Sequence, residues 1–225
     1  MDPLYKKAIA QGIAGMAVFI LLIFVPVGTW RYWQGWVFVV VFSASTTAFT
    51  VYLALYDRPL LERRMSAGPQ YEKDLSQKII VSLMIAAFLL FVILPPLDHR
   101  VALSPVSSLV TLAGDVLIIL SFVFIFWVLK VNSFAAANVS IATDQKVIDS
   151  GPYAVVRHPM YLGALGLFIG IPLALGSWLT ICLLPAVFAT LIWRMVAEER
   201  ILRRELPGYV DYTYRVPHRI IPAIW

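Results

Sequence analysis

The chain has 225 residues, of which 60% are apolar and only 14% are charged. A soluble domain of this length carries nearer 25% charged residues, so the composition argues against a soluble globular protein. The single cysteine, Cys182, excludes an internal disulfide framework, and the net charge of +5 needs a physical explanation.

Six apolar stretches predict an all-α, multi-pass transmembrane helical bundle. They run over about 8–27, 36–56, 79–97, 108–130, 159–175 and 178–197, and a helix needs about 20 residues to cross a hydrocarbon core. Only Gly176-Ser177 separates the last two, which therefore form a C-terminal helical hairpin. Lys6 and Lys7 precede the first stretch, but no small-x-small cleavage site follows, so we expect a retained span rather than a signal peptide.

The basic residues are divided unequally between the two sides of this bundle. With six crossings, the N-terminus, the 57–78 loop, the 131–158 loop and the C-terminal tail share one side. That side holds 16 of the 18 Lys and Arg, and the other holds only Arg31 and Arg100. The positive-inside rule then predicts that both termini are cytoplasmic. Basic groups there are suited to the headgroups of membrane lipids, and no nucleic-acid partner is needed.

One loop shows no helical period. Residues 132–150 contain two apolar pairs that flank the polar residues 143–146, and this arrangement resembles a short cytoplasmic β-hairpin. The pairs are Val139 with Ile141 and Val147 with Ile148.

An acidic residue, Asp115, lies roughly 10 Å inside the fourth stretch at 1.5 Å per residue. An acid inside a membrane is a functional candidate by default. A structural polar contact near the outer surface is the favoured interpretation, because the polar clusters of the chain lie on the opposite side.

The first foot of the hairpin carries a polar cluster in residues 151–163, GPYAVVRHPMYLG. Pro159 suits the first position of a helix, which makes His158 the expected N-cap. A helix N-terminus attracts anions, and Arg157 adds a forked donor suited to carboxylate or phosphate. Tyr161 can point its phenol toward the same space. The alternative is that Arg157 and His158 only anchor the helix to lipid headgroups.

The second foot carries Glu198 and Glu199 at the end of a long apolar helix. Neighbours on a helix differ by about 100° in direction, so one carboxylate is expected to face the bundle and the other water or headgroups. Alternatively, Arg194–Glu198 and Glu199–Arg203 are simple surface pairs with i, i+4 spacing.

Three small residues, Gly163, Gly166 and Gly170, line one side of the first hairpin helix. Close packing against another helix is the favoured interpretation, and space for a ligand against the backbone is the alternative.

Taken together, the motifs resemble the isoprenylcysteine carboxyl methyltransferase family, within a wider set of integral-membrane methyltransferases that includes phospholipid N-methyltransferases. The resemblance covers about residues 130–222, and the RHPxY element with EE at this separation is its most specific part. The matching positions are Asn132, Phe134, Gly151, Tyr153, Arg157, His158, Pro159, Tyr161, Glu198, Glu199, Gly208, Tyr209, Tyr212 and Pro222.

The resemblance implies an S-adenosylmethionine-dependent enzyme that acts on a lipid or prenylated acceptor. The implied cofactor-binding residues are Tyr153, Arg157, His158, Pro159, Tyr161, Gly163, Glu198 and Glu199. The implied catalytic residues are Arg157, Glu198 and Glu199, the substrate-binding residues are Asn132, Phe134, Tyr209 and Tyr212, and no metal is expected. We expect one integral membrane domain, 1–225, with peripheral spans in 1–57 and the cofactor-binding core in 130–222.

The acceptor most like that of the family is a prenylcysteine carboxylate, which needs no base. A phospholipid amine is the alternative, and Glu198 or Glu199 would then take the proton. The sequence also leaves open an NADPH-dependent membrane reductase, a haem-bearing isomerase and a non-enzymatic membrane component. Haem is disfavoured because His99, one of only three histidines, is assigned to the far side of the membrane from His158 and His218.

Overall fold

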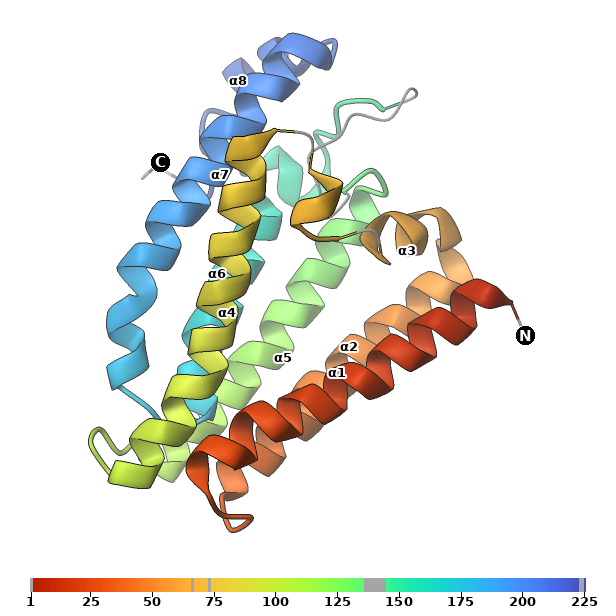
Figure 1. Cartoon of the computed structure of the whole chain (residues 1–225). Helices are drawn as coiled ribbons and strands as arrows, with labels where there is room; N and C mark the ends of the chain where they lie inside the picture. Colours follow the sequence, from red (N-terminus) through yellow and green to blue (C-terminus); the bar gives the residue numbers. More distant parts are fainter. Residues whose placement is uncertain (1, 66, 73, 136–144, 223–224) are drawn as a thin grey trace.

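The computed structural model is an all-α bundle, and it describes residues 2–65, 67–72, 74–135, 145–222 and 225 (Figure 1). In this part of the chain the long helices are α1 Pro3–Val27, α2 Trp33–Tyr56, α4 Leu75–Val101, α5 Ser108–Val131, α6 Pro159–Ala174 and α7 Leu184–Glu205. The short elements are α3 Arg58–Met65, η1 Pro69–Tyr71, η2 Gly151–Ala154, η3 Leu179–Leu183 and α8 Tyr209–Arg215. The predicted all-α, multi-pass architecture is confirmed.

Five of the six predicted segments are helices long and apolar enough to cross a membrane. They are Leu4–Val27, Trp33–Tyr56, Leu75–Val101, Ser108–Val131 and Leu179–Glu205. The remaining segment, predicted over 159–175, is α6. It has 16 residues and spans about 24 Å, so it is shorter than a typical crossing helix. It still runs antiparallel to its neighbours α5 and α7 (Figure 1), and the predicted hairpin therefore exists with a short first arm.

Three short connections meet at one end of the bundle, which we name the loop end: residues 28–32, 102–107 and 175–178. The Tyr32 hydroxyl donates a hydrogen bond to the Leu175 carbonyl. Ser177 donates to the Asp98 carboxylate over 2.6 Å, and Ser104 donates to the same carboxylate. These contacts satisfy polar groups that have little access to water.

The opposite end, which we name the polar end, holds the start of α1 and the segments 57–72, 145–158 and 206–222. The Tyr5 hydroxyl donates to the Ala54 carbonyl over 3.0 Å, and Asp2 pairs with Arg58 at 2.6 Å, so the chain begins beside the end of α2. This is the grouping that the charge distribution predicted. That the polar end faces the cytoplasm remains a prediction.

Glycines bring α5 and α6 into close contact. A Cβ atom at Gly166 would lie 2.4 Å from Ser121 Oγ, and one at Gly163 would lie 2.5 Å from Ile125 Cγ1. At Gly170 a Cβ would lie 2.9 Å from Ile118 Cγ1. Real Cβ atoms do not approach so closely, and the favoured interpretation of these glycines as packing positions agrees with the contacts.

Two further expectations concern single segments. The first half of the expected β-hairpin, with Val139 and Ile141, lies outside the described residues, and residues 145–149 form no regular element. Asp115 is 4% exposed, and within the described structure neither of its carboxylate oxygens has a hydrogen-bond partner. Its place is in the first turns of α5, near the loop end, away from the polar clusters of the hairpin feet.

Candidate active site

A cavity of about 480 Å³ opens at the polar end of the bundle. This volume lies within the usual range of small-molecule sites, about 300–1,000 Å³. The apolar part of the lining comes largely from α4, with Ile80, Met84 and Phe88, and the charged part includes Arg157 and Glu198 from the two feet of the hairpin. A site with this division suits a ligand that is polar at one end and apolar at the other.

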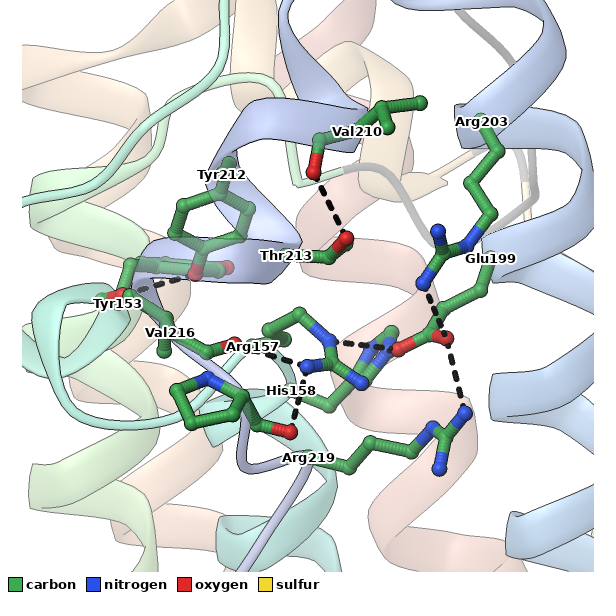
Figure 2. A network of polar contacts seen from close by, with 11 residues as sticks. Tyr153, Arg157, His158, Glu199, Arg203, Val210, Tyr212, Thr213, Val216 and Arg219 are labelled. Carbon is green, nitrogen blue, oxygen red and sulfur yellow. Dashed lines mark hydrogen bonds and ion pairs between the residues drawn. The ribbon is translucent and has the colours of Figure 1, made fainter.

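Glu199 is the centre of a buried network beside this cavity (Figure 2). It is 3% exposed, and its Oε1 accepts a hydrogen bond from Arg157 Nε at 2.8 Å and lies 3.2 Å from His158 Nε2. Its Oε2 lies 3.2 Å from Arg219 Nη2 and 3.9 Å from Arg203 Nη2. One carboxylate thus joins the start of α6, the end of α7 and the C-terminal tail. Glu199 does not itself line the cavity.

The C-terminal tail holds Arg157 in place. Arg157 Nη1 donates to the carbonyls of Val216 and Pro217 over 2.8 and 2.7 Å, and the Arg157 backbone N–H donates to the His218 carbonyl over 3.0 Å. With Nε bound to Glu199, no hydrogen bond from the remaining nitrogen, Nη2, is seen among the described residues. Because Arg157 lines the cavity, Nη2 is the group left for a ligand.

Glu198 faces the cavity, unlike its neighbour. Its Oε2 accepts a hydrogen bond of 2.5 Å from the Tyr161 hydroxyl, and both side chains line the cavity. The two glutamates do point in different directions, as their spacing predicts. The expectation that one of them faces water or lipid headgroups is wrong, because Glu199 enters the buried network.

Sequence reasoning missed the role of Arg194. This side chain is 6% exposed, its Nη2 contacts Glu72 Oε1 at 2.8 Å, and its Nη1 donates to Gln77 Oε1. The interpretation of Arg194 as part of a surface pair is therefore wrong. Its position one helical turn before Glu198 was the signal that both line one face of α7.

The tyrosines of α8 complete the site. The Tyr212 hydroxyl donates to the Tyr153 carbonyl over 2.7 Å, whereas the Tyr209 hydroxyl is buried and has no hydrogen-bond partner among the described residues. Burial raises the pKa of Tyr153 to about 12, and burial and the charges of Glu199 and Glu198 raise the pKa of Tyr209 above its usual value. These phenols are therefore neutral near pH 7.

The remaining predicted site residues divide into two groups. Asn132 and Phe134 line the cavity, and the Asn132 side chain lowers the pKa of the Tyr153 phenol, against the larger effect of burial. Pro159 occupies the first turn of α6, and Gly163 packs against Ile125 of α5, so neither belongs to the cavity wall.

Part of the chain matches the model of a known protein family. Residues 109–207, somewhat less than half of the chain, match the model of a family described as phospholipid methyltransferase. The segment runs from the start of α5 to just past the end of α7 and includes Arg157, His158, Tyr161 and both glutamates of the second foot. It falls within the integral-membrane methyltransferase set that the motifs resemble. The match names phospholipid methyltransferases and not the narrower isoprenylcysteine carboxyl methyltransferase family.

Proposed function

Taking residues 109–207 as a segment of the integral-membrane methyltransferase set, we propose that the cavity binds S-adenosylmethionine and that the protein methylates a lipid acceptor. The observation that carries this proposal is the meeting of Arg157 and Glu198 in one cavity that also has an apolar wall. The two residues are separated by the whole hairpin in sequence, and the Glu199 network supports their meeting.

The residues present fit this cofactor. Arg157 Nη2 and the N-terminus of α6 suit the carboxylate of its amino-acid part, because both offer N–H donors and positive charge. The buried Tyr209 hydroxyl, which lacks a protein partner among the described residues, suits a polar group of the ligand.

The cofactor, when bound, supplies a methyl group on a positively charged sulfur that leaves without help from an acid. The task of the protein is to align the acceptor and to exclude water. The apolar side chains of Met84, Phe88 and Leu191 serve exclusion. The Glu198 carboxylate serves as general base when the acceptor is an amine, because a protonated amine must lose its proton before it can attack.

The acceptor we favour is a phospholipid amine. The family match names phospholipids, and a carboxylate that faces the cavity suits an amine better than a second carboxylate, which it would repel. A prenylcysteine carboxylate is the second candidate, because the motifs of the hairpin resemble that family. Haem ligation by paired histidines gains no support, since His99 packs against Tyr32 at the loop end, with ring centroids 4.5 Å apart, far from His158.

Methyl transfer to defined acceptors tests this proposal. Purified protein in detergent is incubated with S-adenosylmethionine labelled in the methyl group, and with either phosphatidylethanolamine or a prenylcysteine analogue. We expect label in the phospholipid, and loss of that label in Arg157→Ala. Gly12→Ala, on the open face of α1, serves as the control that keeps full activity. Label in neither lipid would refute the proposed reaction.

A further inference from the structure

Arg64 is a cation in the cavity wall that the proposed methyl-donor contacts do not use. It lies in the last turn of α3, is half-buried, and lines the cavity. Its guanidinium carbon lies 5.5 Å from the centre of the Phe49 ring. Among the described residues no carboxylate pairs with it, and burial without a counter-charge lowers the pKa of Arg64. An arginine remains charged under such conditions.

Two of the other charged groups of the cavity wall are in ion pairs. Arg157 is paired with Glu199 at 2.8 Å, and Arg194 is paired with Glu72 at 2.8 Å. Glu198 is held by the Tyr161 hydroxyl. Arg64 and Lys146, which also lines the cavity, are therefore the cations of the wall for which no carboxylate partner is seen among the described residues, and such cations favour a ligand with an anionic group.

The position of Arg64 separates it from the proposed cofactor contacts. Its neighbour Arg63 donates to the Ser133 carbonyl over 2.6 Å, which fastens α3 to the segment containing Asn132 and Phe134. These two residues line the cavity beside α3, whereas the proposed cofactor contacts come from Arg157, from the start of α6 and from Tyr209 of α8. Arg64 thus lies beside Asn132 and Phe134, two of the four residues for which the sequence predicts acceptor binding.

We propose that Arg64 binds the phosphate of the phospholipid acceptor. This inference rests on the proposed function and deepens it by assigning a specificity residue. The guanidinium fork matches two phosphate oxygens, and the guanidinium carbon lies over the Phe49 ring, 5.5 Å from its centre, in a cation–π contact that positions it. A phosphate at Arg64 and an amine at Glu198 would bind the two charges of an ethanolamine headgroup at separate points of one cavity.

Binding of short-chain lipids to the purified protein tests the assignment. The probes are dioctanoylphosphatidylethanolamine and dioctanoylglycerol, which lacks the phosphate, and S-adenosylhomocysteine is titrated separately by calorimetry. In Arg64→Gln we expect at least about tenfold weaker binding of the phospholipid, with dioctanoylglycerol and S-adenosylhomocysteine unchanged. Arg58→Gln removes the same charge from the exposed side of α3 and is expected to bind like the wild type.

Several outcomes would overturn the assignment. These are unchanged phospholipid affinity in Arg64→Gln, equal losses for the two lipids, or a loss confined to S-adenosylhomocysteine, which would assign Arg64 to the cofactor. If Arg64→Gln does not fold, the wild-type protein decides: it should bind dioctanoylphosphatidylmethanol, an anion without an amine, at least about tenfold more tightly than dioctanoylglycerol. Equal affinities would contradict the proposal. A wild-type protein that binds no S-adenosylhomocysteine but binds phosphate through Arg64 would refute the proposed function alone.

Discussion

Arg157 and Glu199 form a buried ion pair, with 2.8 Å between Nε and Oε1, although 42 residues separate them in the chain. The pair closes the two feet of the α6–α7 hairpin upon each other. The same carboxylate also binds the C-terminal tail, because its second oxygen accepts a hydrogen bond from Arg219. The geometry of the cavity therefore depends on a carboxylate that is not in its wall.

Substitution Glu199→Gln is expected to destabilise the protein. Loss of the charge leaves the buried Arg157 without its partner, and breaking one side of a buried pair typically costs about 3–5 kcal/mol. Thermal unfolding in detergent measures the loss. Glu205→Gln is the matched control at the end of the same helix, where the carboxylate is exposed and, among the described residues, pairs with the exposed Arg204. Equal melting temperatures for the two variants would show that the Glu199 carboxylate does not stabilise the contact between the two feet of the hairpin.

Substitution Glu198→Gln is expected to leave the fold intact and to slow the reaction. The amide can still accept the hydrogen bond from Tyr161, but it cannot take a proton from an amine. Loss of a general base lowers the rate by about 100-fold or more. Turnover with phosphatidylethanolamine measures this loss, and unaltered turnover in the folded variant would remove Glu198 as the base.

Substitution Gly166→Ala is expected to destabilise the contact between α5 and α6. The new Cβ would lie 2.4 Å from Ser121 Oγ, and overpacking of this kind costs about 1–3 kcal/mol. Adding Ser121→Ala removes the clashing oxygen and should recover most of the stability, since the Ser121 Cβ lies at an ordinary 3.5 Å. Gly12→Ala, with open space around it, is the control and should not destabilise. A double variant no more stable than Gly166→Ala would contradict the account of this contact.

Substitutions of two neighbouring tyrosines are expected to have opposite effects. Tyr209→Phe removes a buried hydroxyl that has no partner in the described structure, so the unliganded protein should be as stable as the wild type. Its affinity for S-adenosylhomocysteine should fall about fivefold or more, because a ligand contact is lost. Tyr212→Phe removes the hydrogen bond to Tyr153 and should lower stability instead. Urea unfolding and calorimetry on both variants distinguish the two roles, and a stability loss in Tyr209→Phe would contradict this assignment.

The sequence predicted the bundle and the meeting of the hairpin feet because both depend on local signals. Apolar length defines the helices, and the short connection 175–178, followed by η3, turns the chain so that α7 runs back along α6. The prediction that the third stretch ends near 97 was too short. Helix α4 continues to Val101, since Asp98 near its end is satisfied by Ser104 and Ser177 of the loop end.

Long-range polar partners were beyond sequence reasoning. The pairing of Arg194 with Glu72 joins residues 122 positions apart, and no periodic pattern indicates which acid meets which base. The place of Arg64 in the cavity wall could not be predicted either. In the sequence, a cation in a basic loop indicates only which side of the membrane the loop lies on. The division of roles between Glu198 and Glu199 follows from the rotation of α7 about its axis, which only packing defines.

Calorimetric titration of S-adenosylhomocysteine into the purified wild-type protein tests the central claim most directly, because it requires no knowledge of the acceptor. We expect one molecule bound per chain, with a dissociation constant of about 1 mM or tighter, and no detectable heat in Arg157→Ala. The absence of both binding heat and a thermal shift in the folded wild-type protein would contradict the assignment of this cavity to a methyl donor.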